Sequence, residues 1–433
     1  MEAIPPEPSR LVAPEHEVSN RIKPTIRERL QGTAGRRAFI VVLLVLGILF
    51  PLIDGNEGDI DAAANALAFA ILALGLNIVV GFAGLLDLGY AAFFAIGAYT
   101  YGVFSSYQVQ PEWWGFWEPF QWLGLVQHVH PASGPDTVHF TVSFWLMLPV
   151  SAVITAFFGV LFGAPTLRLK GDYLAIVTLG FGEIVPIVAR NTPYLTNGAM
   201  GLNGVASPSF FGYAFGVKST PFFYLGLALA ALLIFVSLRL KDSRIGRAWL
   251  AIREDELAAS MMGVSLVKTK LSAYAVGAVF GGLGGVCYAT LVGSVFPNFS
   301  FNFSITILLM VVLGGMGNVW GVIIGALLIA WINYTGLAQF GNWFNGQFNT
   351  NVNFTSWNFL IFGVILVLMM LFRREGLLPE SRTRLIMREP ARTELEAVGS
   401  DIEAAEAEEF AVSGVSEEEL VAAEPAPRDG DSS

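Results

Sequence analysis

Residues 243–263 read SRIGRAWLAIREDELAASMMG, and this stretch decides how the rest of the chain must be arranged. It is a charged, helix-prone island between long apolar runs. Charged side chains are costly inside a lipid bilayer, so a stretch this polar must face water. Its acidic middle and the small residues that follow favour a surface helix that docks on a soluble partner.

The composition predicts an all-α polytopic membrane protein. Of 433 residues, 54% are hydrophobic and only 14% are charged, whereas soluble domains carry about 25% charged residues. Since a membrane-spanning helix needs about 20 apolar residues, we expect about ten transmembrane or discontinuous helices, with a range of eight to ten. The expected spans are 38–53, 62–82, 86–107, 141–164, 172–190, 221–239, 271–295, 303–317, 319–338 and 356–372.

The basic residues predict the orientation. Of 25 Lys and Arg, 23 lie in 1–37, at Arg168 and Lys170, in 239–270 and in 373–428. Ten spans place all four groups on one side, which the positive-inside rule assigns to the cytoplasm. Both termini and the 243–263 stretch are therefore expected to be cytoplasmic. The opposite side would receive 54–61, 108–140, 191–220 and 339–355.

Three regions follow from this pattern. Residues 1–37 form a basic cytoplasmic segment that we expect to be mobile. Residues 38–372 form the transmembrane domain, with a cytoplasmic loop at 240–270. Residues 373–433 form an acidic cytoplasmic tail, expected to be disordered because it is rich in Glu, Ala and Ser; from residue 375 onward it holds 16 acids against 5 bases.

Polar residues at membrane depth are candidates for a translocation pathway. Asn77 and Asp87 flank the sequence GFAG at 81–84, where we expect a helix to break. Glu183 lies within a predicted span, and it either lines a polar path or pairs with a polar group on an adjacent helix. For Asp87, nearer the cytoplasmic end, a boundary role is the favoured alternative.

Glycines repeat at every fourth position in two runs, and each triplet lines one face of a predicted helix. Such faces let a neighbouring backbone approach closely. They indicate either a mobile helix interface in a transporter or the ordinary close packing of any polytopic protein. The residues are Gly277, Gly281 and Gly285, and separately Gly317, Gly321 and Gly325.

A Gly-interrupted stretch at 79–97 also resembles one at 311–325, so an internal, inverted repeat is possible.

The sequence contains no motif that indicates catalysis by this chain. No Gly-Lys pair occurs, so the nucleotide-binding pattern GxxxxGK[ST] is absent. The single cysteine, Cys287, excludes a disulfide framework, and His128, His130 and His139 are expected to be solvated loop residues. We expect no metal site and no cofactor in this chain.

Three segments carry a resemblance to a known family. They are GLNIVVGFAGLLDLGYAAFFAIGAY at 75–99, LRLKGDYLAIVTLGFGEIV at 167–185 and VLGGMGNVWGV at 312–322. The 243–263 stretch lies between the second and the third of them. In this order, within residues 62–372, the four stretches resemble the LivM-type permease subunits of branched-chain amino acid ABC importers. The chain departs from the family at Pro186, where the resemblance leads us to expect Arg soon after Glu-Ile-Val.

The resemblance implies a role for the 243–263 stretch. Permeases of this kind carry a cytoplasmic helix, the EAA loop, that fits a groove on the ATPase subunit. Gly263 matches the loop's glycine, while Leu257 stands where the motif has Glu. The expected docking residues are Glu254, Asp255, Glu256, Ala258, Ala259 and Gly263.

The function that the resemblance implies is ATP-driven import of branched-chain or other apolar amino acids. The expected partners are two ATPase subunits that bind the ATP, a second homologous permease, an extracytoplasmic solute-binding protein and the lipid bilayer; no nucleic acid is expected. The expected location is the plasma (inner) membrane of a prokaryote. Two alternatives stay open: a urea or short-amide permease of the same superfamily, and an ion-coupled secondary transporter that uses Glu183. A membrane enzyme is not expected.

Overall fold

The computed structural model describes residues 45, 47–53, 55–106, 114–130, 132, 137–140, 142–166, 169, 171–210, 213–216, 218–373 and 375–378. The chain divides into two compact units, Met1–Gly55 and Asn56–Ser433. In the first unit, residues 47–53 are helical. The expected basic segment 1–37, Arg168, Lys170 and the acidic tail beyond residue 378 lie outside the described residues.

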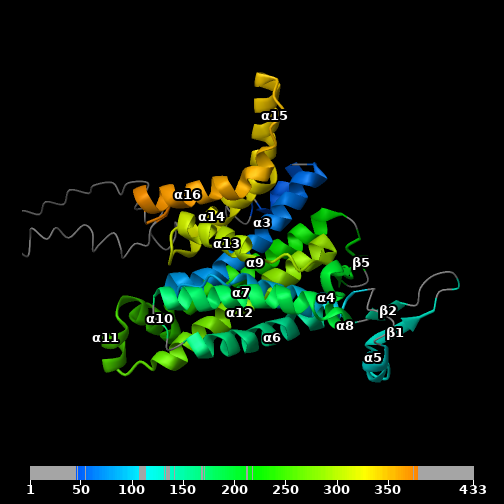
Figure 1. The fold of residues 1–433 in the computed structure, drawn as a ribbon, viewed down its shortest axis with the longest axis horizontal. Coiled ribbons are helices and arrows are strands. Elements are labelled where there is room, and N and C mark those ends of the chain that lie inside the picture. Colours follow the sequence, from blue (N-terminus) through cyan, green and yellow to red (C-terminus); the bar gives the residue numbers. More distant parts are fainter. Residues whose placement is uncertain are drawn as a thin grey trace, which may run out of the picture. The chain divides into compact units, whose positions relative to one another are not determined.

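Helices make up nearly all of the regular structure of the second unit (Figure 1). The long helices are α3 (Glu57–Leu76), continued by the π-helix η1 (Asn77–Phe82), α6 (Phe144–Thr166), α7 (Asp172–Arg190), α9 (Ser219–Asp242), α12 (Leu266–Val292) and α16 (Asn358–Phe372). The shorter helices are α4 (Ala91–Val103), α5 (Trp114–Gln121), α8 (Pro193–Thr196), η3 (Gly198–Met200), α10 (Arg244–Glu254), α11 (Glu256–Met261), α13 (Phe301–Gly314), α14 (Val319–Trp331), η4 (Ile332–Gly336), α15 (Leu337–Phe348) and η5 (Phe354–Trp357).

Six short strands among the described residues form three antiparallel pairs: β1 (Val126–Val129) with β2 (Thr137–Phe140), β3 (Leu202–Asn203) with β6 (Ser294–Val295), and β4 (Ser209–Phe210) with β5 (Tyr213–Ala214). All other regular structure in the described residues is helical, which confirms the predicted all-α class.

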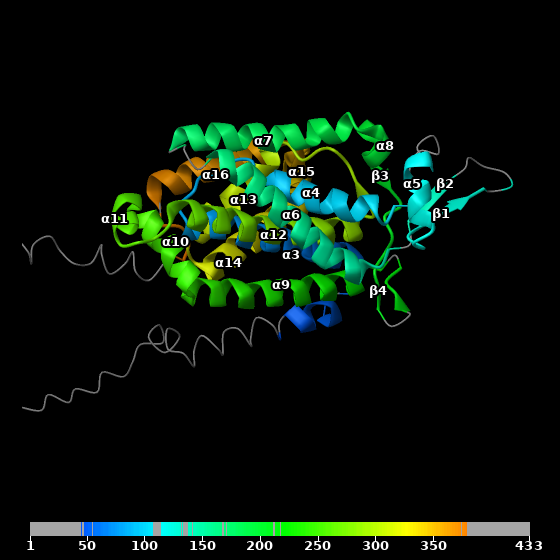
Figure 2. The same ribbon diagram turned by 90° about the horizontal axis from the view of Figure 1, so that it is seen from below.

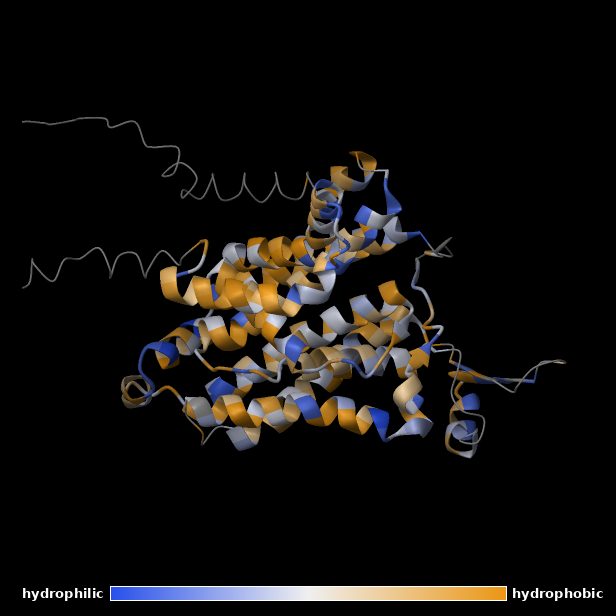
Figure 3. Ribbon diagram, turned by 45° about the horizontal axis from the view of Figure 1, so that its top comes forward, coloured by the Kyte–Doolittle hydropathy of each residue, from blue (hydrophilic) through white to orange (hydrophobic). Residues whose placement is uncertain are grey.

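Seven helices among the described residues are long and apolar enough to cross a membrane, and α4 and α13 are shorter apolar helices. Hydrophobic residues run along the helices, while many hydrophilic residues lie at helix ends and loops (Figure 3). Helices α10 and α11 lie at one end of the bundle, and α5, α8, β1 and β2 lie at the other (Figures 1 and 2). This arrangement places the 240–270 loop opposite the described parts of the loops at 108–140 and 191–220, as the sequence predicted.

The core lies around α3 and α12. Within the apolar part of α3 and η1, 94% of residues are buried in the protein, against 67% in α12 and 6% in the segment that contains α16. Helix α12 packs on α3, α4 and α6, and it carries the buried Cys287. The outer faces of α6, α7, α9 and α16 are exposed and apolar, as expected of surfaces that meet lipid or another membrane subunit.

Helices α4 and α13 are too short to span a bilayer. The predicted spans 86–107 and 303–317 shrink to 13 and 14 residues, which is about 20 Å of helix against a bilayer core of about 30 Å. Residues 84–90 are not helical, and Gly84 has a φ of +70°. Helix α13 ends at Gly314, and the capping residue Gly315 has a φ of +112°. Both elements are therefore discontinuous helices.

The expected loop at 339–355 is wrong over most of its length. The chain continues from α14 through the π-helical η4 into α15, which ends at Phe348. In Figure 1, α15 projects away from the other helices. Phe354 contacts both Phe340 and Phe344, at ring-centroid distances of 5.1 and 5.3 Å, so the returning chain packs on α15.

The two segments that suggested a repeat run in the same direction. The ring of Phe69 on α3 lies 5.2 Å from that of Phe303 near the start of α13, and a Cβ atom on Gly81 in η1 would lie 2.7 Å from the amide nitrogen of Gly317 just past the end of α13. The two helices therefore run side by side in the same direction. An inverted repeat requires opposite directions, so the structure does not support one between 79–97 and 311–325.

The glycine runs pack helices of the same chain. A Cβ atom on Gly285 would lie 2.1 Å from the carbonyl oxygen of Phe94 on α4, and one on Gly325 would lie 2.4 Å from that of Met310 on α13. Gly277 and Gly281 pack against Val79 and Phe93, and Gly321 packs against Gly314. The second triplet does not line one helix face, because Gly317 precedes α14 and has a φ of +85°.

The first prediction follows from this packing. Replacing Gly285 with Ala should destabilise the α4–α12 contact by about 1–3 kcal/mol, because the new methyl group overlaps a backbone carbonyl that cannot rotate away. The matched control is Gly363→Ala on α16, where nothing lies within 4 Å of the added carbon. Thermal unfolding in detergent measures both; equal melting temperatures for the two variants would contradict the packing described above.

Candidate functional site

The 243–263 stretch forms two short helices, α10 and α11, with a corner at Asp255. The Ser243 hydroxyl caps α10 by accepting from the backbone N–H of Gly246 at 3.2 Å. The Asp255 carboxylate caps α11 by accepting from the N–H groups of Leu257 at 2.7 Å and Ala258 at 3.0 Å. Asp is among the residues preferred at this position. One continuous surface helix was expected, and the extended backbone of Asp255 divides it.

Helix α10 is fixed to the start of α12. Trp249 is fully buried, and its indole N–H donates to the Ser272 hydroxyl at 2.9 Å and to the Thr269 carbonyl at 3.1 Å. Glu256, at the start of α11, forms an ion pair of 2.7 Å with Lys270, which is itself buried. The loop is therefore a packed extension of the bundle.

The predicted docking residues fall on different sides of the loop. Glu254, Asp255, Ala258 and Gly263 are exposed. Glu256 is half-buried, and Ala259 is buried, so its methyl group faces the loop interior. Gly263 has a φ of +84° with open space around it. Its position therefore requires glycine for the backbone turn rather than for a close contact within the chain.

Sequence reasoning missed the most exposed apolar residues of this loop. Leu257, Met261 and Met262 have exposed fractions of 65%, 77% and 85%. We refer to these three residues as the apolar tip. Large apolar side chains are thus exposed on α11 and at its C-cap, where the sequence analysis singled out only acidic and small residues. The signal was present in the spacing, because Leu257 and Met261 are four residues apart and so share one helix face.

Asn77 lies where α3 gives way to the π-helix η1. Its side-chain carbonyl accepts from the backbone N–H of Gly317 at 2.8 Å, which joins the turn before α14 to the end of α3. Its side-chain nitrogen is buried without a hydrogen-bond partner. Asn77 therefore closes a junction between two helix ends.

Asp87 lies in the non-helical segment between η1 and α4. One carboxylate oxygen accepts from the N–H of Gly89 at 2.8 Å, and the other is buried without a hydrogen-bond partner. The next residue, Leu88, donates its N–H to the Thr178 hydroxyl on α7 at 3.1 Å. Asp87 thus lies within the observed helix break, and Asn77 lies in η1 just before it.

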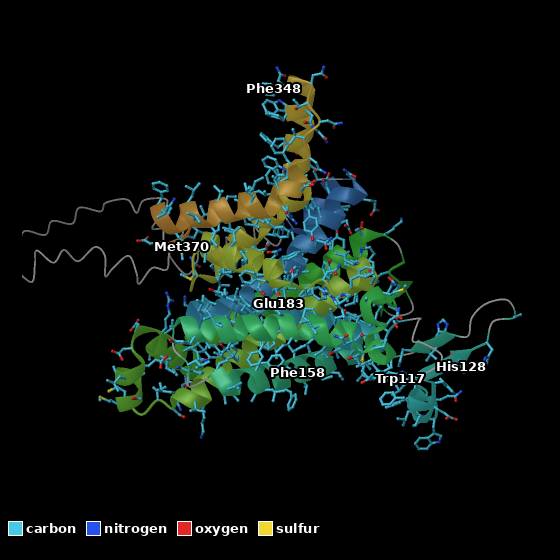
Figure 4. All side chains as sticks on the ribbon, in the orientation of Figure 1. Trp117, His128, Phe158, Glu183, Phe348 and Met370 are labelled. Atoms are coloured by element: carbon cyan, nitrogen blue, oxygen red, sulfur yellow. The ribbon has the colours of Figure 1, made fainter. Side chains whose placement is uncertain are left out.

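Glu183 lies along α7 (Figure 4), next to Gly182, where a Cβ atom would lie 2.9 Å from Cα of Gly89 in that break. Its carboxylate accepts from the backbone N–H of Phe301 at 2.9 Å, at the first residue of α13. The side chain therefore pairs with a polar group on an adjacent helix, which is one of the two alternatives that the sequence left open. A carboxylate in this place also complements the positive end of the α13 dipole.

The histidines lie on the β1–β2 pair and just after β1, near α5. His128 stacks on Trp114 with a ring-centroid distance of 4.4 Å and lies 4.0 Å from His130. His139 stands opposite Gln127 in the strand pair. Within the part of the chain that the structure describes, no group of three His, Cys, Asp or Glu side chains could hold a metal ion.

Comparison with known proteins agrees with this architecture. The family described as branched-chain amino acid transport system / permease component matches residues 60–370. The high-affinity branched-chain amino acid transport system permease protein LivM of Salmonella typhimurium is 36% identical over 376 residues, covering 82% of this chain and 77% of that protein. The LivM protein of Escherichia coli is also 36% identical, covering 83% of this chain and 79% of that protein.

A second permease protein is similar over a shorter region. LivH of Salmonella typhimurium is 32% identical over 103 residues, which is 24% of this chain and 32% of that protein. No solved structure matches the chain. The match across residues 60–370 includes every helix from α4 to α15, as well as the three segments that carried the resemblance. The chain therefore belongs to the family of branched-chain amino acid transport system permease components.

Proposed function

We propose that this chain is the membrane-spanning subunit of an ATP-driven importer that moves branched-chain or other apolar amino acids into the cell. The observation that carries the proposal is the 36% identity to LivM over 82% of the chain. The bundle of apolar helices with a packed, water-facing loop at one end is consistent with it. In this role the chain performs no chemistry of its own and needs no cofactor, since partner subunits bind the ATP.

The proposed location is the plasma (inner) membrane of a prokaryote, and the proposed complex contains a second, similar permease. LivM and LivH are both named as permease proteins of a high-affinity branched-chain amino acid system in Salmonella typhimurium, which supports a pair of permeases. The exposed apolar surface of α16 offers membrane-facing area for lipid or for that second subunit. An extracytoplasmic binding protein would deliver the solute at the β1–β2 end.

The proposed ATPase contact is the loop α10–α11, with two ATPase subunits serving the two permeases. The apolar tip stands in water, where exposed large hydrophobic side chains are unfavourable unless a partner covers them. Acidic side chains at Glu254 and Asp255 border the tip. The proposed partner surface is thus an apolar groove with a basic rim.

The second prediction tests this contact. Replacing Leu257, Met261 and Met262 together with Gln should abolish co-purification of the ATPase, because burying each apolar side chain contributes about 1.5–3 kcal/mol. The amount of inserted chain should not change, since these side chains are mostly exposed. The matched control is Trp122→Gln, an 89% exposed residue near the opposite end of the bundle. Unchanged ATPase recovery with the triple variant would contradict docking at the tip.

The third prediction separates the proposed function from its alternatives. Deleting the gene should abolish high-affinity uptake of leucine, isoleucine and valine, and should leave urea uptake unchanged. Depleting ATP while an ion gradient is maintained should stop the leucine uptake. Loss of urea uptake would favour the short-amide permease. Leucine uptake that survives ATP depletion but stops with a protonophore would favour the ion-coupled transporter.

A further inference from the structure

The end of α3 leaves backbone carbonyls that no further helical turn can bind. In η1 the backbone hydrogen bonds span more residues than in an α-helix, with the N–H of Ala83 donating to the carbonyl of Ile78 at 3.2 Å and that of Leu85 to the carbonyl of Val79 at 3.0 Å. The chain then leaves the helix at Gly84. Carbonyls in the last turn of a helix lack intrahelical partners and carry the negative end of its dipole. A cation is the favourable partner for such a group.

Arg253 supplies that cation from the loop. Its guanidinium Nη1 donates to the Gly81 carbonyl oxygen at 2.5 Å, across 172 residues of sequence. Arg253 lies in the last turn of α10, two residues before the Asp255 corner. The loop that carries the apolar tip is thus joined directly to the broken end of a membrane helix.

Two glycines make this contact sterically allowed. A Cβ atom on Gly84 would lie 2.9 Å from Cγ of Arg253 and 3.3 Å from its Cα, so the side-chain stem of Arg253 lies against the bare backbone there. A Cβ atom on Gly81 would lie 2.7 Å from the amide nitrogen of Gly317. The GFAG sequence at 81–84 therefore accommodates the arginine and the neighbouring turn.

A second cation, in the last turn of α9, binds the backbone at the other helix break. Lys241, in the last turn of α9, donates from Nζ to the Gly317 carbonyl oxygen at 2.7 Å and lies 5.4 Å from the ring centroid of Phe82. The N–H of Gly317 in turn donates to Asn77 at 2.8 Å. The turn before α14 is thus tied both to α9 and to η1.

We propose that Arg253 is the positioning residue that transmits displacement of the α10–α11 loop to the membrane break at 81–90, with Lys241 as the second connection. The inference rests on the proposed function, in which an ATPase moves this loop. Because a charge-assisted hydrogen bond is stronger than a neutral one, and the Arg253 stem is held against Gly84, the loop and the break move as one body.

The test uses the complete transporter and compares two rates. Arg253→Met keeps an apolar stem along Gly84 and removes the donor to Gly81. We expect normal ATPase co-purification and continued ATP hydrolysis, while leucine taken up per ATP hydrolysed falls about tenfold, a typical size for coupling between sites. Both rates are measured per mole of folded transporter, so a lower yield of the variant does not change the ratio.

Two single variants serve as controls. Arg253→Lys keeps a cationic donor and should restore most of the uptake per ATP. Arg247→Met lies on the same helix, where the native guanidinium donates to the carbonyl oxygen of Asp242 at 2.9 Å within the loop itself. It should leave the ratio unchanged. A ratio that stays at the wild-type value in Arg253→Met, or falls equally in Arg247→Met, overturns the proposal.

A double variant checks that the effect passes through this contact. Gly84→Ala should displace Arg253 and lower the ratio, and combining it with Arg253→Met should cause no further loss, because residues that act through one contact are not additive. Independent, multiplying losses overturn the proposal. If no ATPase co-purifies with the wild-type chain, the proposed function itself is excluded. That result can be told apart from a changed ratio of leucine uptake to ATP hydrolysis.

Discussion

Backbone groups freed where a membrane helix breaks must find partners inside the protein, since lipid offers none. This constraint governs the described part of the molecule at three places. Arg253 binds the carbonyl of Gly81. Asn77 binds the N–H of Gly317, and Lys241 binds its carbonyl. Glu183 binds the N–H of Phe301. Polar side chains that look out of place in an apolar sequence thus each hold a broken helix end.

The glycine packing and the breaks depend on one another. Helix α12 brings α3, α4 and α6 close together, and its small residues allow the short helix α4 to lie against it along most of its length. Without that contact α4, which cannot span a bilayer by itself, would lose its support. The buried core therefore fixes the positions of the breaks, while the loosely buried outer helices remain available for lipid or a neighbouring subunit.

The sequence predicted the helices well where apolar runs are bounded by charges. The expected span 172–190 coincides with α7, because Asp172 and Arg190 mark its ends. The sequence-based prediction of a loop at 339–355 failed at α15. These residues include Asn, Gly and aromatic residues but no charged ones, a composition that hydropathy cannot distinguish from a loop. Here the continuing helix from α14 and the packing of Phe354 on Phe340 determine the structure.

For the candidate site, the sequence identified the polar residues but not their partners. Asn77 and Gly317 are 240 residues apart, and Glu183 and Phe301 are 118 residues apart. No local pattern can pair them, since only the folded bundle brings them together. Within the docking loop, the acids and small residues were recognised by motif, whereas the direction of each side chain depended on the corner at Asp255, which turns Ala259 inward and Leu257 outward.

The burial of Cys287 has a practical consequence for spectroscopy. It is the only cysteine in the sequence, and it lies in the core of α12 with an exposed fraction of 7%. Thiol reagents need an accessible thiolate, which an apolar interior disfavours. The native chain should therefore bind very little of a thiol-reactive label. A cysteine introduced on an exposed loop should be the residue that takes up a fluorophore or spin label.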